Sequence, residues 1–151
     1  VWLSYHAVKA NNKSFNVSIQ EDYANGLPLV KIIPQDFSRA VLNLMNNACY
    51  AVFSKSKEAT GTAYQPTIRI SLKKEGDRIN LAIEDNGQGI SEEIKKKLYT
   101  PFFTTKPIGE GTGLGLSITK SIIEQKHNGT IEMDTRPGEY TRFTISIPIQ
   151  Q

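Results

Sequence analysis

The order of patterned segments along the chain predicts an α+β fold, in which helices pack on one face of a mixed, mostly antiparallel sheet. Segments that alternate apolar and polar residues, as half-buried strands do, come mostly in pairs joined by short turns. Two longer segments repeat their apolar residues every three to four positions, which indicates amphipathic helices. Strands and helices in blocks with hairpin connections are typical of the α+β class.

The first part of the chain contains two predicted strands and a long helix. Residues 1–10 have the pattern of a helix end, which the polar residues after them terminate. Residues 15–20 alternate as a half-buried strand does, and residues 27–34 are predicted to form a second short strand that ends at its proline. A helix is then predicted from about Gln35 to Ser54. Its apolar face is formed by Phe37, Val41, Leu44, Ala48 and Val52.

The rest of the chain is predicted to contain two hairpins and two helices. After a polar loop at residues 54–66, residues 67–85 contain two alternating runs around the turn "EGD", which predicts a hairpin. Residues 91–98 are predicted to form a short helix with their first residue, a serine, as its N-cap. Residues 112–127 have the pattern of an amphipathic helix, and residues 129–148 that of a closing hairpin.

Composition indicates one globular domain. A chain of 151 residues, of which 38% are hydrophobic and 22% charged, has the composition of a soluble protein with a single core. No apolar run approaches the ~18 residues that a membrane span needs, and no segment resembles a signal peptide. Because the first residue is Val1 and not methionine, we expect this chain to be a piece of a longer protein.

Cysteine content and charge exclude several kinds of site. The single cysteine, Cys49, excludes an internal disulfide and a cysteine-built zinc site, and its apolar, helical surroundings predict a buried structural thiol. The net charge of +3 suits a site for anionic ligands. The chain lacks the clustered lysines and arginines of a nucleic-acid surface, so no nucleic-acid partner is expected.

A glycine-rich stretch, "PFFTTKPIGEGTGLGL", occupies residues 101–116. It is not a dinucleotide fingerprint, because the third glycine position falls on Leu116 or Ile118, and it is not a P-loop, because no Gly-Lys pair occurs in the chain. What remains is a flexible backbone that runs into a helix N-terminus at about Thr112, where unpaired N–H groups favour an anion. The alternative is that these glycines only pack a tight loop.

A second stretch, "EDNGQGIS", begins at Glu84. Asp85 ends an apolar strand, and Gly87 and Gly89 allow the backbone to approach a ligand closely. A carboxylate at this place can accept a hydrogen bond from an exocyclic amine, which would select adenine. The alternative is an ordinary turn aspartate, which is common in Asp-Asn-Gly sequences.

A third stretch, "VLNLMNNACYAV", lies on the long predicted helix. Asn43 and Asn47 are four residues apart and share one helical edge beside the apolar face. Asparagine is a middling helix former, so its repetition needs a reason. Amide oxygens are hard ligands that suit Mg²⁺ bound together with nucleotide phosphates. The alternative is a polar helix edge or a set of core amides.

Taken in their order along the chain, the Asn-rich helix, then Asp-x-Gly-x-Gly, then Phe-Phe-Thr-Thr-Lys and Gly-x-Gly-x-Gly, these three stretches resemble the ATP-binding catalytic domain of sensor histidine kinases. They match the N, G1, F and G2 boxes of the Bergerat fold, a two-layer α/β sandwich shared with type II topoisomerases, a heat-shock chaperone and mismatch-repair ATPases. The resemblance covers the chain from about Phe15 to Pro148. It implies that residues 15–151 are the catalytic domain, that residues 1–14 are the end of an upstream dimerisation helix or linker, and that a lid spans about 99–113. The forms "NNAxxAV" and "PFFTTKPxGxGTGLGL" are similar to the nitrogen-regulatory sensor kinases.

The resemblance implies a role for each matched position. Asp85 would bind the adenine amine, with Thr141 helping through water. Asn47 would coordinate the Mg²⁺ that bridges the phosphates of ATP, Asn43 would contact phosphate, and Lys106 would contact the γ-phosphate, which makes these last three the catalytic candidates. The other expected nucleotide-binding residues are Tyr50, Ala51, Gly87, Gly89, Ile90, Phe103, Thr104, Thr105, Gly109, Gly111, Thr112, Gly113, Leu114, Gly115 and Leu116. The lid is predicted to be mobile when empty and ordered by ATP.

Two departures from related sequences bear on the activity. Many histidine kinases carry a basic residue where this chain has Tyr50, so Lys106 would have to supply the phosphate-facing cation. The ATPase relatives place a glutamate, the general base, where this chain has Asn43, so slow hydrolysis is expected. Kinase activity is therefore the leading interpretation, and a Bergerat ATPase or a degenerate nucleotide-binding scaffold is the alternative.

The resemblance also implies partners outside the chain. His6 and His127 lack the surroundings of a phosphoacceptor and are predicted to be structural, so the accepting histidine is expected on an upstream dimerisation domain. A response regulator receiver domain would take the phosphate from it. The chain itself is expected to be monomeric, and the full-length kinase to be a homodimer. We expect a cytoplasmic domain, with any membrane anchor of the full-length protein in upstream segments.

Overall fold

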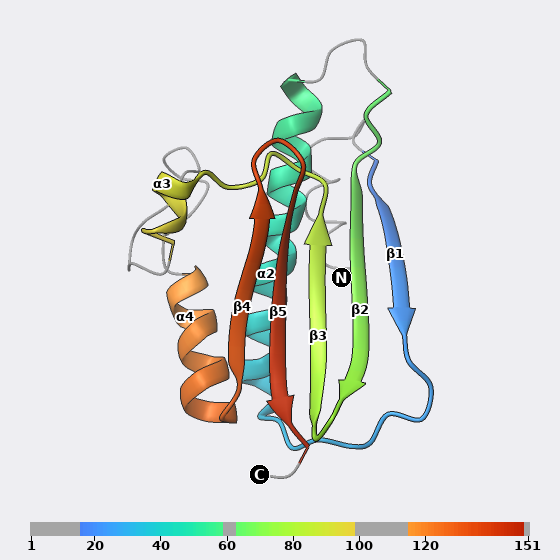
Figure 1. Cartoon of the computed structure of the whole chain (residues 1–151), viewed down its shortest axis with the longest axis vertical. Coiled ribbons are helices and arrows are strands. Elements are labelled where there is room, and N and C mark those ends of the chain that lie inside the picture. Colours follow the sequence, from blue (N-terminus) through green and yellow to red (C-terminus); the bar gives the residue numbers. More distant parts are fainter. Residues whose placement is uncertain (1–15, 59–62, 99–114, 150–151) are drawn as a thin grey trace.

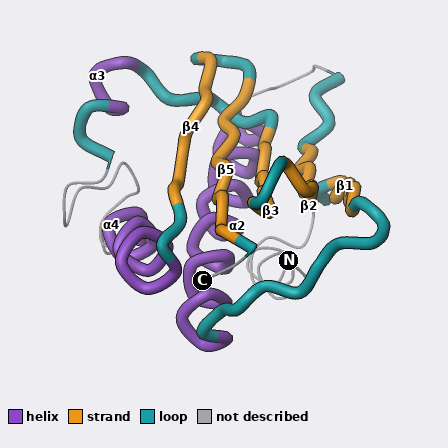
Figure 2. The backbone as a smooth tube through the Cα atoms, turned by 60° about the horizontal axis from the view of Figure 1, so that its bottom comes forward, coloured by secondary structure: helices purple, strands orange, loops and turns teal. Residues whose placement is uncertain are grey.

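A computed structural model describes residues 16–58, 63–98 and 115–149, which form a five-stranded sheet with helices on one face (Figures 1 and 2). The strands are β1 (Ser18–Tyr23), β2 (Thr67–Glu75), β3 (Arg78–Asp85), β4 (Thr130–Arg136) and β5 (Tyr140–Pro148). The helices are α2 (Pro34–Glu58), α3 (Glu92–Lys95) and α4 (Gly115–Ser121), and α4 continues into a π-helical turn, η1 (Ile122–Lys126). The predicted fold class is confirmed. In this described part of the chain, no helix is long and apolar enough to cross a bilayer.

The sheet is mixed and mostly antiparallel, as predicted. Its strand order is β1-β2-β3-β5-β4, in which β1 pairs with β2 in parallel and the three other pairs are antiparallel. Both predicted hairpins, β2–β3 and β4–β5, are present. Their turns contain Gly76 and Gly138, whose positive φ angles of 62° and 79° suit glycine. The pairing of β3 with β5 places the last residues of β3 beside the start of β5.

Helix α2 packs its apolar face on the sheet. Its buried residues repeat at helical spacing, and three of the five predicted face residues are among them. The other two, Phe37 and Val41, are partly buried against the same core. The helix extends beyond the predicted Ser54 to Glu58, and the lysines in its last turn suit the negative end of the helix dipole. Its buried residues are Ala40, Leu44, Met45, Ala48, Cys49 and Val52.

The strand predicted at residues 27–34 is absent, and that prediction was wrong. This segment is instead a loop from β1 to α2, and the Leu29 side chain is 96% exposed. Two prolines explain the difference: Pro28 cannot donate to a ladder, and Pro34 has a fixed φ that suits the first residue of a helix. The strand that does pair here is β1, which lies slightly later than the predicted residues 15–20.

His127 is structural, as predicted. Its ring is 1% exposed, Nε2 accepts a hydrogen bond from the Ile33 N–H at 2.9 Å, and Nδ1 lies 2.9 Å from the carbonyl oxygen of Ile122. Because Nε2 accepts, the proton resides on Nδ1 and is donated to that carbonyl. The ring thereby joins the end of η1 to the residue before α2, and the Phe37 ring packs edge-on against it with centroids 5.5 Å apart. The π-helical turn itself was not predicted.

Candidate functional site

Two buried polar side chains meet where β3 ends. Asp85, the last residue of β3, is directly opposite Thr141 on β5, and the two residues are only 5% and 4% exposed. Since side chains alternate across a strand, Asp85 shares the helix-covered face with the buried Ile83. A carboxyl group at this position must find a hydrogen-bond donor within the molecule or on a ligand.

The turn after Asp85, residues Asp85–Gly89, is wedged between α2 and the β4–β5 turn. The N–H of Gly87 donates to Asp85 Oδ1 at 2.9 Å. A Cβ on Gly87 would lie 2.7 Å from the Cβ of Ala51 on α2, and a Cβ on Gly89 would collide with the backbone of Arg136. Gly89 also has φ +70°. Both glycines are therefore required by close packing, and the Gly87 contact places the turn directly against α2.

The surroundings of Asp85 favour its neutral form. Burial raises the pKa of Asp85 to about 7, and the charge of Glu84 raises it further, while the hydrogen bond from the Gly87 N–H and the charge of Lys55 lower it. The carboxyl group therefore changes protonation near neutral pH. A ligand that donates a hydrogen bond to it would favour the ionised form, because a carboxylate is the stronger acceptor.

Asn43 lies against the first turn of α4. Its Nδ2 donates to the carbonyl oxygen of Gly115 and to Thr119 Oγ1, both at 3.3 Å, and Thr119 Oγ1 in turn donates to the Gly115 carbonyl at 2.7 Å. These bonds fix α4 beside α2 (Figure 2). Asn47, one turn later on α2, is half-buried, and within the described part of the chain its side chain has no hydrogen-bond partner.

This contact predicts a measurable effect of Asn43→Asp. A carboxylate cannot donate, so the change leaves two oxygens facing the Gly115 carbonyl, and the free energy of unfolding should fall by about 1–3 kcal/mol. Urea denaturation measures it. Asn46→Asp, an exposed position on the same helix, is the matched control and should change stability little. Equal unfolding midpoints for the two variants would contradict the role of Asn43 in holding α4.

The structure brings the predicted site residues together in three pairs: Asp85 with Thr141, Ala51 with Gly87, and Asn43 with Gly115. Tyr50 and Asn47 lie on α2, Ile90 follows the Asp85–Gly89 turn, and Leu116 is the second residue of α4. The remaining predicted residues lie outside the described residues, as do residues 1–14 and the lid at 99–113. They are Phe103, Thr104, Thr105, Lys106, Gly109, Gly111, Thr112, Gly113 and Leu114.

Thr135 is a residue of this region that sequence reasoning missed. It is opposite Thr141 on β4, and their hydroxyl oxygens are 3.0 Å apart. Its Oγ1 donates to the Tyr140 carbonyl at 2.9 Å and accepts from the Ile90 N–H at 3.0 Å. Thr135 thus ties the exit of the Asp85–Gly89 turn to the β4–β5 hairpin. The hairpin predicted at residues 129–148 contains both threonines, but its register was not predicted, so nothing in the sequence analysis paired Thr135 with Thr141.

The described residues suit a metal ion that takes one protein ligand and is bound otherwise by water and nucleotide phosphates. Within residues 16–58, 63–98 and 115–149, no three His, Cys, Asp or Glu side chains lie close enough to hold an ion. The amide oxygen of Asn47 is a hard ligand without a competing protein partner in this part of the chain. One amide of this kind fits Mg²⁺, which keeps several waters and binds nucleotide phosphates directly.

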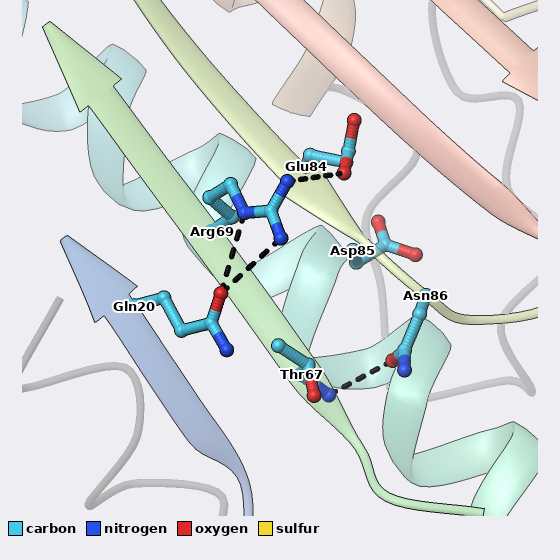
Figure 3. Close-up of a pocket in the computed structure, with 6 residues that line it drawn as sticks. All are labelled: Gln20, Thr67, Arg69, Glu84, Asp85 and Asn86. Atoms are coloured by element: carbon cyan, nitrogen blue, oxygen red, sulfur yellow. Dashed lines mark hydrogen bonds and ion pairs between the residues drawn. The ribbon is translucent and has the colours of Figure 1, made fainter. Parts of the chain in front are cut away.

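A shallow hollow of about 260 Å³ lies near the same end of the sheet, among the polar side chains of its open face (Figure 3). Arg69 there pairs with Gln20 at 3.3 Å and with Glu84 at 3.9 Å, and Asn86 Oδ1 accepts from the Thr67 N–H at 2.8 Å. Asp85 is also among the residues that line this hollow, but alternation along β3 directs its side chain to the helix-covered face. Because the polar side chains of the open face already bond to one another, the hollow does not suit a nucleotide.

Comparison with known proteins gives a consistent result. The family model described as histidine kinase-, DNA gyrase B- and HSP90-like ATPase matches residues 33–151. The chain is 31% identical over 147 residues to the sensor histidine kinase ZraS of Salmonella typhimurium, covering 97% of this chain and 29% of ZraS. It is 35% identical over 139 residues to the sensory histidine kinase/phosphatase NtrB of Klebsiella oxytoca, covering 90% of this chain and 38% of NtrB.

Solved structures agree with these relatives. The catalytic domain of the histidine kinase ThkA superposes with a TM-score of 0.75 at 28% identity, and the match covers 99% of this chain and 92% of that domain. The chain spans less than two fifths of the two curated relatives but nearly all of this isolated catalytic domain. The predicted resemblance to sensor histidine kinases, in the subgroup of the nitrogen-regulatory sensors, is confirmed.

Proposed function

The chain belongs to the family of histidine kinase-, DNA gyrase B- and HSP90-like ATPases, and from that premise we propose that it binds Mg-ATP and presents the γ-phosphate to a histidine of a sensor kinase. Residues 15–151 form this catalytic domain in the proposal, and residues 1–14 are the end of a dimerisation helix or a linker. The family membership supports ATP as the nucleotide. The role of each residue, the metal and the acceptor are part of the proposal.

The adenine base is proposed to bind at the end of β3. Asp85 is the acceptor for the exocyclic amine, and Gly87 and Gly89 keep the turn beside it free of side chains. The Thr141 hydroxyl, directly opposite Asp85, contributes through a water molecule. The ionised form of Asp85 rejects guanine, since guanine presents a carbonyl oxygen where adenine presents an amine, and two acceptors then face each other without a donor.

The phosphates are proposed to lie between α2 and the start of α4. Asn47 holds Mg²⁺, and the lid at residues 99–113 covers the triphosphate, with Lys106 as the γ-phosphate cation. Asn43, one turn earlier, contacts phosphate through the NH₂ group that donates to Gly115 and Thr119 when no nucleotide is bound. When bound, Mg²⁺ neutralises charge on the phosphate oxygens and orients them for in-line transfer. The contact of Asn43 with Gly115 supports this arrangement, because it fixes the distance between the two helices.

The amide side chain of Asn43 is the feature that favours phosphotransfer over hydrolysis. A water-activating base must accept a proton, and an amide has no such capacity at neutral pH. The donors of Asn43 are moreover directed at Gly115 and Thr119. His127, the histidine within the described part of the chain, is buried, and both of its ring nitrogens are in hydrogen bonds. It is therefore not the proposed phosphate acceptor. In the proposal it lies on the dimerisation domain of a homodimeric kinase, which passes the phosphate to a response regulator.

The test uses the full-length protein that carries this domain, incubated with Mg²⁺ and γ-labelled ATP. The expected label on the protein is stable in base and labile in acid, as phosphohistidine is, and it disappears with Asp85→Asn. Chain 1–151 alone should release phosphate more slowly than about 10⁻² per second, because it has no activated water. Rapid release by the chain alone, or an acid-stable label, would overturn the kinase proposal.

A further inference from the structure

Lys55, near the end of α2, contacts the Asp85–Gly89 turn although it belongs to none of the stretches that predicted the site. Its Nζ donates to the carbonyl oxygen of Gly138 at 2.8 Å and to those of Asn86 and Gly87 at 3.4 Å each. The ammonium group also lies 4.9 Å from the centre of the Tyr64 ring. An ammonium has three donors, so each of these carbonyls can receive one of them.

These three carbonyls come from two separate segments. Asn86 and Gly87 directly follow Asp85, whereas Gly138 belongs to the β4–β5 turn on the far side of the Asp85–Gly89 turn. Figure 1 shows the end of α2, the end of β3 and the β4–β5 turn at the same end of the molecule. The N–H of Gly138 also donates to the Gln88 carbonyl at 2.6 Å, so the two turns are joined directly as well. Lys55 therefore closes a three-way junction of helix, turn and hairpin.

Asn86 and Tyr64 complete this junction. Asn86 Oδ1 accepts from the Thr67 N–H at 2.8 Å and from the Tyr64 hydroxyl at 3.2 Å, and its Nδ2 donates to the Gln65 carbonyl at 2.8 Å. The single proton of the Tyr64 hydroxyl is shared between Asn86 Oδ1 and the Asn86 carbonyl oxygen, which lies 3.0 Å away. The residue next to Asp85 is thus held on one side by the chain entering β2 and on the other by Lys55.

We propose that Lys55 is a positioning residue for adenine recognition: by clamping the Asp85–Gly89 turn between α2 and the β4–β5 turn, its ammonium group fixes the Asp85 carboxyl in the orientation that accepts the adenine amine. The inference rests on the proposed function and adds to it a residue outside the recognised boxes. Lys55 touches carbonyl oxygens rather than the base, so it acts through Asp85 and the turn.

Electrostatics support the same role. The charged and titratable groups that face Asp85 are Lys55 and Cys49 from α2, Glu84 from β3, and Tyr64 from the segment before β2. Burial raises the pKa of Cys49 to about 11 and that of Tyr64 to about 12, so both stay neutral near pH 7. Lys55 is the cation that lowers the pKa of Asp85, against burial and Glu84. It therefore favours the ionised acceptor.

Lys57 provides a matched control. It lies two residues further along α2, in the same last turn, and its ammonium group is 4.4 Å from the centre of the Phe53 ring. It shares with Lys55 the favourable position at the negative end of the helix dipole and a contact with an aromatic ring. It does not hydrogen-bond the Asp85–Gly89 turn. A difference between the two lysine variants therefore isolates the clamp from the general effect of a cation on α2.

The test measures the affinity for a non-hydrolysable ATP analogue with Mg²⁺ across a range of pH, from about 5.5 to 8.5. Four proteins are compared: the wild type, Lys55→Met, Lys55→Arg and Lys57→Met. Lys55→Met is expected to bind roughly tenfold more weakly at pH 7, the loss of about one charge-assisted hydrogen bond, and its pH midpoint should move to higher pH. Lys55→Arg should recover the midpoint and part of the affinity, and Lys57→Met should match the wild type.

A second measurement without nucleotide separates this inference from the proposed function. Carbon NMR of the Asp85 carboxyl should give a higher titration midpoint in Lys55→Met than in the wild type, whether or not the protein binds ATP. Wild-type affinity and an unshifted midpoint in Lys55→Met would overturn the inference. Weaker binding with an unshifted midpoint would also overturn it, since that result means general destabilisation. Failure of the wild type to bind, with the carboxyl midpoint shifted as expected, would sink the proposed function and with it the adenine role of Lys55, but would leave the contact of Lys55 with the turn and its effect on Asp85 standing.

Discussion

Replacing Gly89 with alanine is expected to lower the free energy of unfolding by about 3–4 kcal/mol, a large fraction of the total stability of a typical domain. Gly89 has φ +70°, a left-handed conformation that costs a residue with a Cβ about 1–2 kcal/mol. The added Cβ would also lie 2.8 Å from the carbonyl carbon of Arg136 and from Pro137 Cα. Both are backbone atoms of a hairpin, so neither can rotate away.

Urea denaturation of the variant measures this loss, and Gly26→Ala is the control. Gly26 has the same φ of +70°, but a Cβ there would meet no atom within 4 Å. Gly26→Ala should therefore lower the free energy of unfolding only by the cost of the left-handed conformation, about 1–2 kcal/mol. The difference between the two variants reports the packing of the Asp85–Gly89 turn under the β4–β5 turn. Similar losses for both variants would show that this close packing is not present in solution.

Asp85→Asn is expected to weaken binding of Mg-ATP about a hundredfold, because an amide is a weaker acceptor and its NH₂ group would face the adenine amine. Calorimetric titration measures the change, with Asp77→Asn as the control. Asp77 is an exposed aspartate in the β2–β3 turn, so its variant has the same loss of charge and should bind as the wild type does. Unchanged affinity in Asp85→Asn would remove Asp85 from the adenine site.

The same substitution should change stability in the opposite direction. The pKa of Asp85 is raised from 3.8 to about 7 by burial, so the folded state prefers the protonated form. The stability from this group is fully present below about pH 4 and is lost as the pH rises through about 7. Asparagine does not ionise, so Asp85→Asn should gain stability relative to the wild type across this window. Thermal unfolding at pH 5 and pH 8 measures it, and a difference that does not grow with pH would contradict the assigned burial of the carboxyl.

The wild-type affinity should also follow this titration. Since the adenine amine donates to the ionised carboxylate, binding is expected to strengthen as the pH rises through about 7 and to release protons below that value. Binding thus requires the ionised form of Asp85, whereas folding favours its neutral form. This opposition is typical of functional sites, where a local cost in stability is offset elsewhere in the fold.

The parts of the fold that the sequence predicted are those fixed by local pattern. Both hairpins follow from alternation around glycine-containing turns, and α2 follows from its apolar spacing. Ser91 indeed caps α3, since its side chain accepts from the Ile94 N–H at 3.3 Å. Asp85, Gly87 and Gly89 were recognisable because a strand end, a carboxyl and two glycines occur within five residues.

The features that were missed depend on contacts between distant segments. No local pattern indicates that β1 pairs in parallel with β2, because this pairing joins two strands that are far apart in the chain. The loop at residues 27–34, in contrast, is indicated locally by Pro28, which the prediction of a strand there did not take into account, and by Pro34, which it took only as the strand end. The lysine at position 55 fell in the predicted polar loop at residues 54–66, and only the fold brings Gly138, which is 83 residues away, to its ammonium group. Spacing within a motif cannot predict a junction of this kind.

The most direct test of the account is a calorimetric titration of chain 1–151 with non-hydrolysable ATP and GTP analogues, each with Mg²⁺. At pH 8, where Asp85 is ionised and can only accept, we expect the adenine nucleotide to bind with one site per chain and the guanine nucleotide not to bind measurably. Binding of neither nucleotide, or equal binding of both, would contradict the claim that the end of β3 forms an adenine-specific site.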